Sequence, residues 1–373
     1  MTHDELLERY FLIRILWWRA ELESLSAEAI AQLVEVLKSV KADIAKRLTD
    51  EAEGLASVTN WTKERLQAVE QWADEVLAEA NAATLSTITD SSVTAAATSL
   101  ATYNAIVSLE HRAKNIQTVG MTTEQIRSWF QDTPLGGGTL AKWVNGAFDN
   151  GVKLSILSTL RKAGVEGKGT AATVKRLLQS AVNEGFRITQ REAATLTRTY
   201  IQTANVQAMD AVYQRNSDII KGVKRVETLD NKTCLICALA DGETYALNEP
   251  KPALPAHPNC RGVWTPITKS WRDLGITAKD LEDAARSWAI REPGPIGAGG
   301  RLKIEKSGTS EERFSGWWFS LSEEDQLKTA IGPIRRKLLL SGDVKWKNLW
   351  DRKTGFPYTL RELGYDEQGN KLD

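Results

Sequence analysis

All three cysteines of this 373-residue chain, Cys234, Cys237 and Cys260, lie in one stretch of 27 residues that also contains His257. Cys-x-x-Cys followed by His-x-x-Cys is a spacing typical of a tetrahedral metal site, because each pair places two soft ligands on one tight turn. An odd, clustered set of cysteines argues against a disulfide framework and for a reducing compartment. The fold must therefore bring two turns, separated by 19 residues, to one point.

We predict that Cys234, Cys237, His257 and Cys260 bind zinc. Four protein ligands fill a tetrahedron and leave no position for water, so the predicted site is structural and not catalytic. The residues between the two pairs can form a hairpin with Asp241–Gly242 as its turn. The alternative is that Cys234 and Cys237 are buried or redox-active thiols and that His257 is a surface residue.

The first third of the chain predicts long helices, because no proline occurs before Pro134. Apolar residues recur at helical spacing over 6–17 and again over 30–48, after a serine-rich start at 24–26. A third helix is predicted over 61–83, with Asn60 as a candidate N-cap. The following stretch, 84–109, is rich in Thr, Ser and Ala. We predict a helix that packs closely against a partner, with a partly extended arm as the alternative.

Two capping-box patterns predict helix starts in the middle of the chain. Thr122–Gln125 opens a short helix, and Thr189–Glu192 opens a long helix that ends near residue 215. Between them we predict two further helices, over 139–160 with a break near Gly151 and over 170–182.

Strand-forming residues first appear at Val223–Leu229, where β-branched side chains break the helical period, and Val263–Thr265 could form a returning strand. The predicted fold class is therefore mainly α with a small β-containing, zinc-ribbon-like module (α+β). It has long N-terminal helices, a helical bundle and short strands within 222–268.

Glycine- and proline-rich breaks at 134–138 and 293–300 suggest boundaries between segments of the chain. The predicted segments are 1–133 (N-terminal helical arm), 139–217 (central helical domain), 218–268 (β/zinc module), 269–292 (helical connector) and 300–373 (C-terminal helical tail).

Charge is unevenly distributed although the chain is neutral overall. Residues 1–133 carry 12 basic and 20 acidic side chains, whereas residues 134–230 carry 14 basic and 8 acidic ones. This basic excess is too small to indicate nucleic-acid binding by itself. No apolar run reaches the roughly 18 residues that a membrane helix needs, so we expect no membrane association. The chain also lacks the His-Glu-x-x-His, Gly-x-Ser-x-Gly, P-loop and zinc-deaminase motifs of common enzyme classes.

One set of spaced residues resembles the signature of the minor head proteins of tailed bacteriophages, the head-morphogenesis family with its Mu-like members. The set is Asp230-x-x-Thr233-Cys234-x-x-Cys237, Asp241-Gly242-x-x-Tyr245 and His257-Pro258-Asn259-Cys260-Arg261. The resemblance covers about 143–268 and 310–373. Two positions depart from the family pattern: Tyr200 stands where an acidic residue usually follows Arg-Thr, and Gly262 stands where a further cysteine is common.

This resemblance implies a minor capsid protein of the virion, present in low copy in the phage head and assembled in the cytoplasm of the bacterial host. Its implied partners are the portal protein and the major capsid or scaffolding protein, with contact to packaged DNA as a further expectation. It implies a structural protein and not an enzyme, with no catalytic or cofactor-binding residues and no small-molecule substrate.

Two other functions stay open at this point. The first is a zinc-ribbon protein that binds nucleic acid, although the stretch 230–261 around the predicted ligands contains only Lys232, Lys251 and Arg261 as cations. The second is a metal-dependent nuclease of the His-Cys type. It would need another histidine as a general base, and His3 and His111 are distant in the sequence.

Overall fold

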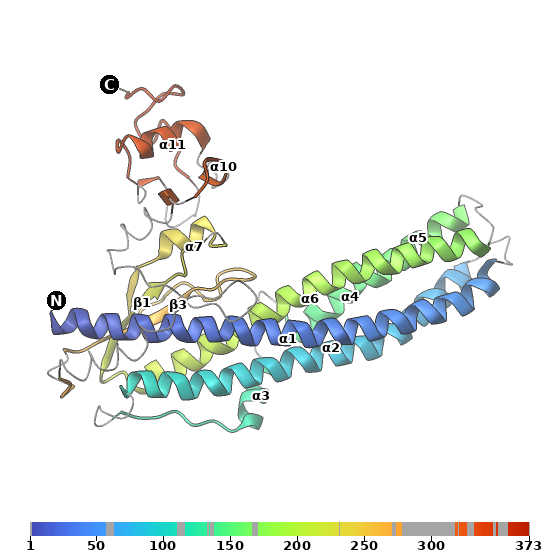
Figure 1. Cartoon of the computed structure of the whole chain (residues 1–373), viewed down its shortest axis with the longest axis horizontal. Coiled ribbons are helices and arrows are strands. Elements are labelled where there is room, and N and C mark those ends of the chain that lie inside the picture. Colours follow the sequence, from blue (N-terminus) through green and yellow to red (C-terminus); the bar gives the residue numbers. More distant parts are fainter. Residues whose placement is uncertain are drawn as a thin grey trace. The chain divides into compact units, whose positions relative to one another are not determined.

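Long helices dominate the structure, a computed structural model (Figure 1). The residues that it describes are 2–56, 63–109, 116–132, 134, 138–165, 171–230, 232–270, 274–277, 318–319, 321–326, 332–345, 348–349 and 357–372. Most of the predicted connector at 269–292, all of the predicted linker at 293–300 and the candidate N-cap Asn60 lie outside these ranges. No helix within them is apolar and long enough to cross a membrane.

The three longest helices of the described residues are α1 (His3–Ala56), α2 (Lys63–Val107) and α6 (Ala171–Arg215). Within the described residues, the helices predicted over 6–17 and 30–48 form one helix, α1. Those predicted over 61–83 and 84–109 form α2, and those over 170–182 and 189–215 form α6. Two predicted helix starts are therefore wrong. Ser26 lies inside α1, where its hydroxyl donates to the carbonyl of Leu22 and so does not cap a new helix. Thr189 lies inside α6, and its hydroxyl donates to the carbonyl of Ala147 on another helix.

The capping box at Thr122–Gln125 is confirmed by its two reciprocal hydrogen bonds, and it opens α3 (Thr123–Asp132). Thr139 then caps α4 (Leu140–Phe148) by accepting from the backbone N–H of Lys142. The predicted break near Gly151 is a π-helical turn, η1 (Asp149–Lys153), which joins α4 to α5 (Leu154–Val165).

Contacts divide the chain into two compact units that each combine distant segments. The bundle unit consists of Glu21–Tyr103 and Val119–Met209, and the sheet unit of Met1–Ala20, Asn104–Thr118 and Asp210–Asp373. Both units draw on several of the five predicted segments, and the five-segment division itself stays a prediction.

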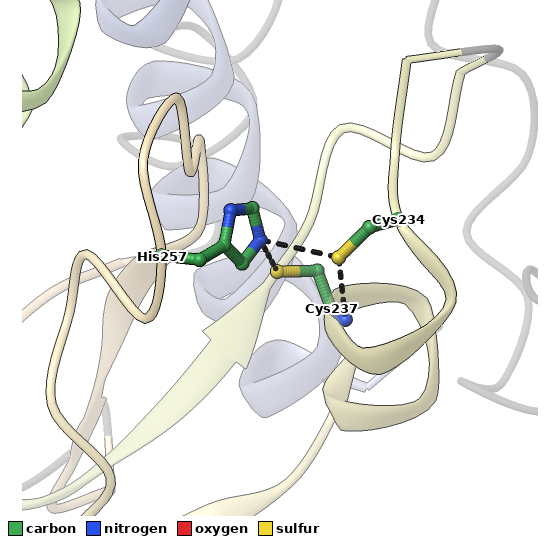
Figure 2. A group of neighbouring side chains, drawn as sticks. All are labelled: Cys234, Cys237 and His257. Atoms are coloured by element: carbon green, nitrogen blue, oxygen red, sulfur yellow. Dashed lines mark hydrogen bonds between the residues drawn. The ribbon is translucent and has the colours of Figure 1, made fainter. Parts of the chain in front are cut away.

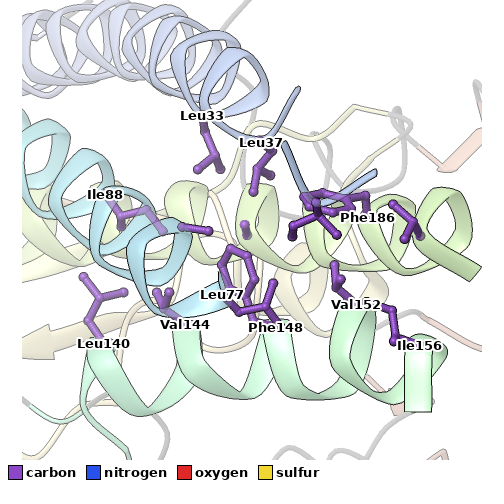
Figure 3. Packing of buried hydrophobic residues seen from close by; sticks show 14 of the residues in the cluster. Leu33, Leu37, Leu77, Ile88, Leu140, Val144, Phe148, Val152, Ile156 and Phe186 are labelled. Carbon is purple, nitrogen blue, oxygen red and sulfur yellow. The ribbon is translucent and has the colours of Figure 1, made fainter. Parts of the chain in front are cut away.

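The bundle unit has one hydrophobic core, shown in Figure 3. Leu33 and Leu37 of α1 meet Leu77 and Ile88 of α2 there. The opposite side of the core comes from α4, η1, α5 and α6, with Leu140, Val144, Phe148, Val152, Ile156, Val182, Phe186, Ala193 and Tyr200. Along α6, Ala193, Tyr200, Ala204 and Met209 are buried and Leu196 is partly buried.

The sheet unit contains one antiparallel sheet in the order β2-β1-β3. Strand β1 (Ile220–Val226) lies in the centre, between β2 (Thr244–Ala246) and β3 (Val263–Thr268). In register, Val223 is opposite Tyr245 on one side and Pro266 on the other. The fold class is therefore mainly α with a small three-stranded antiparallel sheet, and the predicted returning strand at Val263 is confirmed.

The predicted hairpin between the two ligand pairs is wrong. A short helix, α7 (Leu235–Ala240), follows Cys234, and the turn at Asp241–Gly242 joins this helix to β2. Gly242 has a φ of +83°, which explains the glycine at this turn. Strand β2 then pairs with β1, so the segment between the ligand pairs supplies a sheet edge and no independent hairpin.

The described C-terminal residues of the sheet unit pack on α7. Helix α10 (Glu323–Gln326) and helix α11 (Gly332–Leu340) flank a small core that contains Ala238 of α7 and the fully buried Trp318. The amide of Gln326 donates to the backbone carbonyl of Trp318. This packing places the helix that follows Cys234 between the sheet and the chain's end.

Candidate metal centre

Cys234 and Cys237 lie on the first turn of α7. Cys234 is the N-cap residue, with φ −73° and ψ 157°, and its sulfur accepts a hydrogen bond of 3.4 Å from the backbone N–H of Cys237. Cys237 is buried, whereas Cys234 is half-buried. The Cys-x-x-Cys spacing thus forms an N-cap and a helical turn that point both sulfurs to one side, as Figure 2 shows.

His257 approaches the two sulfurs from the loop between β2 and β3 (Figure 2). Its Nε2 lies 3.1 Å from the Sγ of Cys234 and 3.1 Å from the Sγ of Cys237. Its Nδ1 lies 2.8 Å from the backbone carbonyl of Pro258, to which an N–H at that atom donates. That hydrogen bond directs Nε2 towards the sulfurs, which is the usual arrangement for a histidine that binds a metal.

One ligand atom from each of Cys234, Cys237 and His257 lies within 4.8 Å of the other two. The predicted fourth ligand, Cys260, is buried beside them, with its Sγ 3.8 Å from the Sγ of Cys237. Cys260 does not belong to the mutually close group of three. The structure therefore shows three candidate ligands converging, and the set of four stays a prediction.

The donor set and its spacing fit zinc. A tetrahedron with Zn–S bonds of about 2.3 Å has S–S edges of about 3.8 Å, which is the separation of Cys237 and Cys260. An edge between sulfur and nitrogen is about 3.5 Å, and the 3.1 Å distances from His257 Nε2 to the two sulfurs are shorter than this edge. A disulfide would need an S–S distance of about 2.05 Å, and all three cysteines are unpaired.

Hydrogen bonds within the cluster shift the pKa values of its members in opposite directions. Hydrogen bonds from Cys237 and from His257 lower the pKa of Cys234 to about 4. Hydrogen bonding from Cys237, and from the backbone at Ala256 and Gly262, lowers the pKa of Cys260 to about 5. The hydrogen bond with Cys234 raises the pKa of His257 to about 9. Cys237, which donates to two sulfurs, has a raised pKa.

A buried ion pair between Arg225 of β1 and Glu227, which follows the strand, lies against the cluster. The guanidinium of Arg225 donates to the Sγ of Cys237 at 3.4 Å and to the carboxylate of Glu227 at 2.8 Å. Burial raises the pKa of Glu227 to about 7, although Arg225 opposes this shift. A Cβ at residue 262 would lie 2.3 Å from Oε1 of Glu227, so this position favours glycine.

The other residues of the resembled signature join the two ligand-bearing loops. The guanidinium of Arg261 donates to both carboxylate oxygens of Asp230, with one distance of 2.7 Å, and to the hydroxyl of Thr233 at 3.2 Å. Asp230 and Thr233 precede Cys234, and Arg261 follows Cys260. We call these three residues the clamp, because they tie the His257–Cys260 loop to the start of α7.

Helix α1 also contacts the clamp. The Nε of the buried Arg19 donates to the backbone carbonyl of Arg261 at 2.8 Å. No sequence signal points to this contact across 242 positions. Arg225 and Glu227 were also missed by the sequence analysis, although two opposite charges at i and i+2 of a strand share one face and could have suggested a pair.

Comparison with models of known protein families, with characterised proteins and with solved structures finds no match to this chain.

Proposed function

We propose that the chain is a metal-stapled structural protein of the phage head-morphogenesis type, a low-copy component that associates with the portal vertex during procapsid assembly and DNA packaging. The observation that supports this proposal is the clustering of the signature residues. Asp230, Thr233 and Arg261 form the clamp, and Cys234, Cys237 and His257 converge beside it. Signature residues that contact one another in a single site support the resemblance more strongly than their spacing in the sequence does.

Zinc fits the site as a structural ion. The residues that would hold it are Cys234, Cys237, His257 and Cys260. With four protein ligands the ion would link α7 to the loop before β3 and would keep no open position for a substrate. His257 would be held as a ligand, since its Nε2 faces two sulfurs, and would not serve as a general base.

The test of the assembly role is co-expression with the cognate portal protein, followed by affinity capture of the portal. We expect this chain to be retained together with the portal and to co-sediment with it. The Arg261→Lys variant loses the two-pronged contact with Asp230 and should be retained less well if the metal site supports the docking surface. A chain that elutes entirely apart from the portal would refute the assembly role.

The same purified chain can be tested for the two alternative functions, a nuclease and a nucleic-acid-binding protein. Metal-dependent nicking of plasmid DNA that His257→Ala abolishes would identify a nuclease. Tight DNA binding that weakens steeply with salt, in the absence of portal binding, would identify a nucleic-acid-binding protein.

A further inference from the structure

The bundle unit contains a groove that the proposed function does not use. It lies between α4–η1 and α6 and has a volume of about 530 Å³. Val144 and Phe148 point from α4 into the core in Figure 3. The groove is lined instead by Lys142, Trp143 and Gly146 of the same helix.

Close backbone packing fixes the shape of the groove at one end. A Cβ at Gly151 would lie 2.1 Å from Oγ1 of Thr189 and 2.9 Å from the carbonyl of Gly185. A Cβ at Gly185 would lie 2.7 Å from Cα of Val152. These two glycines therefore let η1 and α6 cross in direct contact, and the space between α4 and α6 beyond the crossing is preformed.

The floor and wall of the groove are apolar. Ala147, Ile188 and Leu196 contribute to the lining, and the ring of Trp143 is 39% exposed beside them. The Trp143 Nε1–H donates to the carbonyl of Gly138 at 3.2 Å, so the ring has a fixed orientation. The lining runs from Lys142 on α4 to Asn150 on η1, a rise of about 12 Å. This length matches two to three turns of a helix.

The rim of the groove is mainly basic. Lys142 and Arg191 are exposed, and neither side chain has an acidic partner in the part of the chain that the structure describes. Arg187 is already paired with Glu184 through two hydrogen bonds. Glu192 is the one carboxyl in the lining, and burial raises its pKa. Two unpaired cations thus flank an apolar floor.

We propose that this groove binds an amphipathic helix of a partner protein whose apolar stripe is bordered by Asp and Glu. The apolar floor suits aliphatic or aromatic side chains at i, i+3, i+4 and i+7, and Lys142 and Arg191 pair with the acidic borders. A nucleic acid would use the cations and Trp143 but would leave the apolar floor unused. The proposal concerns the bundle unit alone and does not depend on the metal.

The test uses a fluorescein-labelled helical peptide of three turns, with leucine at i, i+3, i+4 and i+7 and glutamate on both borders, added to the full chain. Its binding is followed by fluorescence polarisation. We expect saturable binding that is at least about tenfold tighter than that of the same peptide with lysine in place of glutamate. Absence of saturable binding, or equal binding of the two peptides, overturns the proposal.

A matched pair of glycines shows whether the peptide occupies the groove. A Cβ meets no atom within 4 Å at Gly146 in the groove or at Gly120 outside it, so Gly146→Phe and Gly120→Phe should both fold. We expect Gly146→Phe to weaken binding at least about tenfold and Gly120→Phe to leave it unchanged. Equal affinities of the two variants would overturn the proposal.

Variants of the charged residues test whether the rim contributes to peptide binding. Arg191→Glu should weaken binding of the glutamate-bordered peptide by about fivefold or more, and Glu192→Gln should strengthen it. A labelled single-stranded DNA that competes with the peptide and binds more tightly would assign the groove to nucleic acid and overturn the proposal.

Discussion

At the scale of single residues, the clamp accounts for three positions that do not touch the candidate metal. Asp230 accepts from Arg261 and from the backbone N–H of Lys232, and its oxygens also meet Thr233. Burial would raise the pKa of Asp230, but the hydrogen bonds from Arg261, Lys232 and Thr233 hold it at about 2. The carboxylate is therefore stabilised in the folded state.

Removing this carboxylate should have a pH-dependent effect on stability. The pKa of Asp230 is lower in the folded chain than its ordinary value of 3.8, so the contribution is present above about pH 4 and is lost as the pH falls towards 2. After allowance for solvent screening, we expect Asp230→Asn to lower the free energy of unfolding by about 1 kcal/mol at pH 7. Urea denaturation with a chelator present, from pH 7 down to pH 3, measures the change.

Asp218, an exposed residue that forms no ion pair with any residue that the structure describes, provides the control. Asp218→Asn should leave the unfolding free energy within about 0.5 kcal/mol at both pH values. A loss for Asp230→Asn that stayed constant across this range would mean that its carboxylate charge does not cause the effect.

At the scale of the elements, the contact between η1 and α6 depends on the absence of side chains. Gly151→Ala should lower the free energy of unfolding by about 1–3 kcal/mol, because the new Cβ would overlap with Thr189 and with the carbonyl of Gly185. Gly146→Ala, one helix turn earlier, meets no atom and should raise stability by about 0.5–1 kcal/mol through helix propensity.

The unfolding free energies of the two glycine variants can be compared by thermal or chemical denaturation under one set of conditions. Equal effects of Gly151→Ala and Gly146→Ala would contradict the close crossing of η1 and α6.

The sequence predicted the kind of element better than its ends. Helical periodicity over 6–17 and 30–48 correctly predicted helix in what is now α1, because an apolar face that is buried recurs every three to four residues. It placed false starts at residues 24–26 and at Thr189, because Ser and Thr side chains can bond to carbonyls inside a helix or on a neighbouring helix. The residue pattern of a capping box does not distinguish these uses.

Only the part of the candidate site that has a local sequence pattern was predicted. Ligand spacing identified Cys234, Cys237 and His257, whose convergence is observed. Helix α7 was missed, since its six residues are too few for a periodic signal. The contacts of Arg19 and Arg225 depend on tertiary structure and leave no local pattern.

At the scale of the whole molecule, the candidate metal lies in the sheet unit, whereas the bundle unit has its own apolar core. Removing the metal should therefore affect the two units differently. With a chelator, we expect backbone amides of β1, β3 and α7 to exchange hydrogen faster, because the ion no longer links α7 to the loop before β3. Amides of α4 and η1 should keep their protection.

Hydrogen exchange monitored by mass spectrometry measures the protection of the sheet unit and of the bundle unit in one experiment. Cys234→Ser without a chelator should reproduce the pattern of the chelated native chain. Uniform loss of protection across α4 and β1 would contradict a local role for the metal.

The most direct test of the central claim is elemental analysis of the purified chain and of its Cys234→Ser variant. If Cys234, Cys237, His257 and Cys260 hold a structural zinc, the native chain should contain close to one zinc per molecule. The variant should contain much less and should unfold at a lower temperature. Absence of zinc from the native chain after purification without chelators would contradict the metal staple.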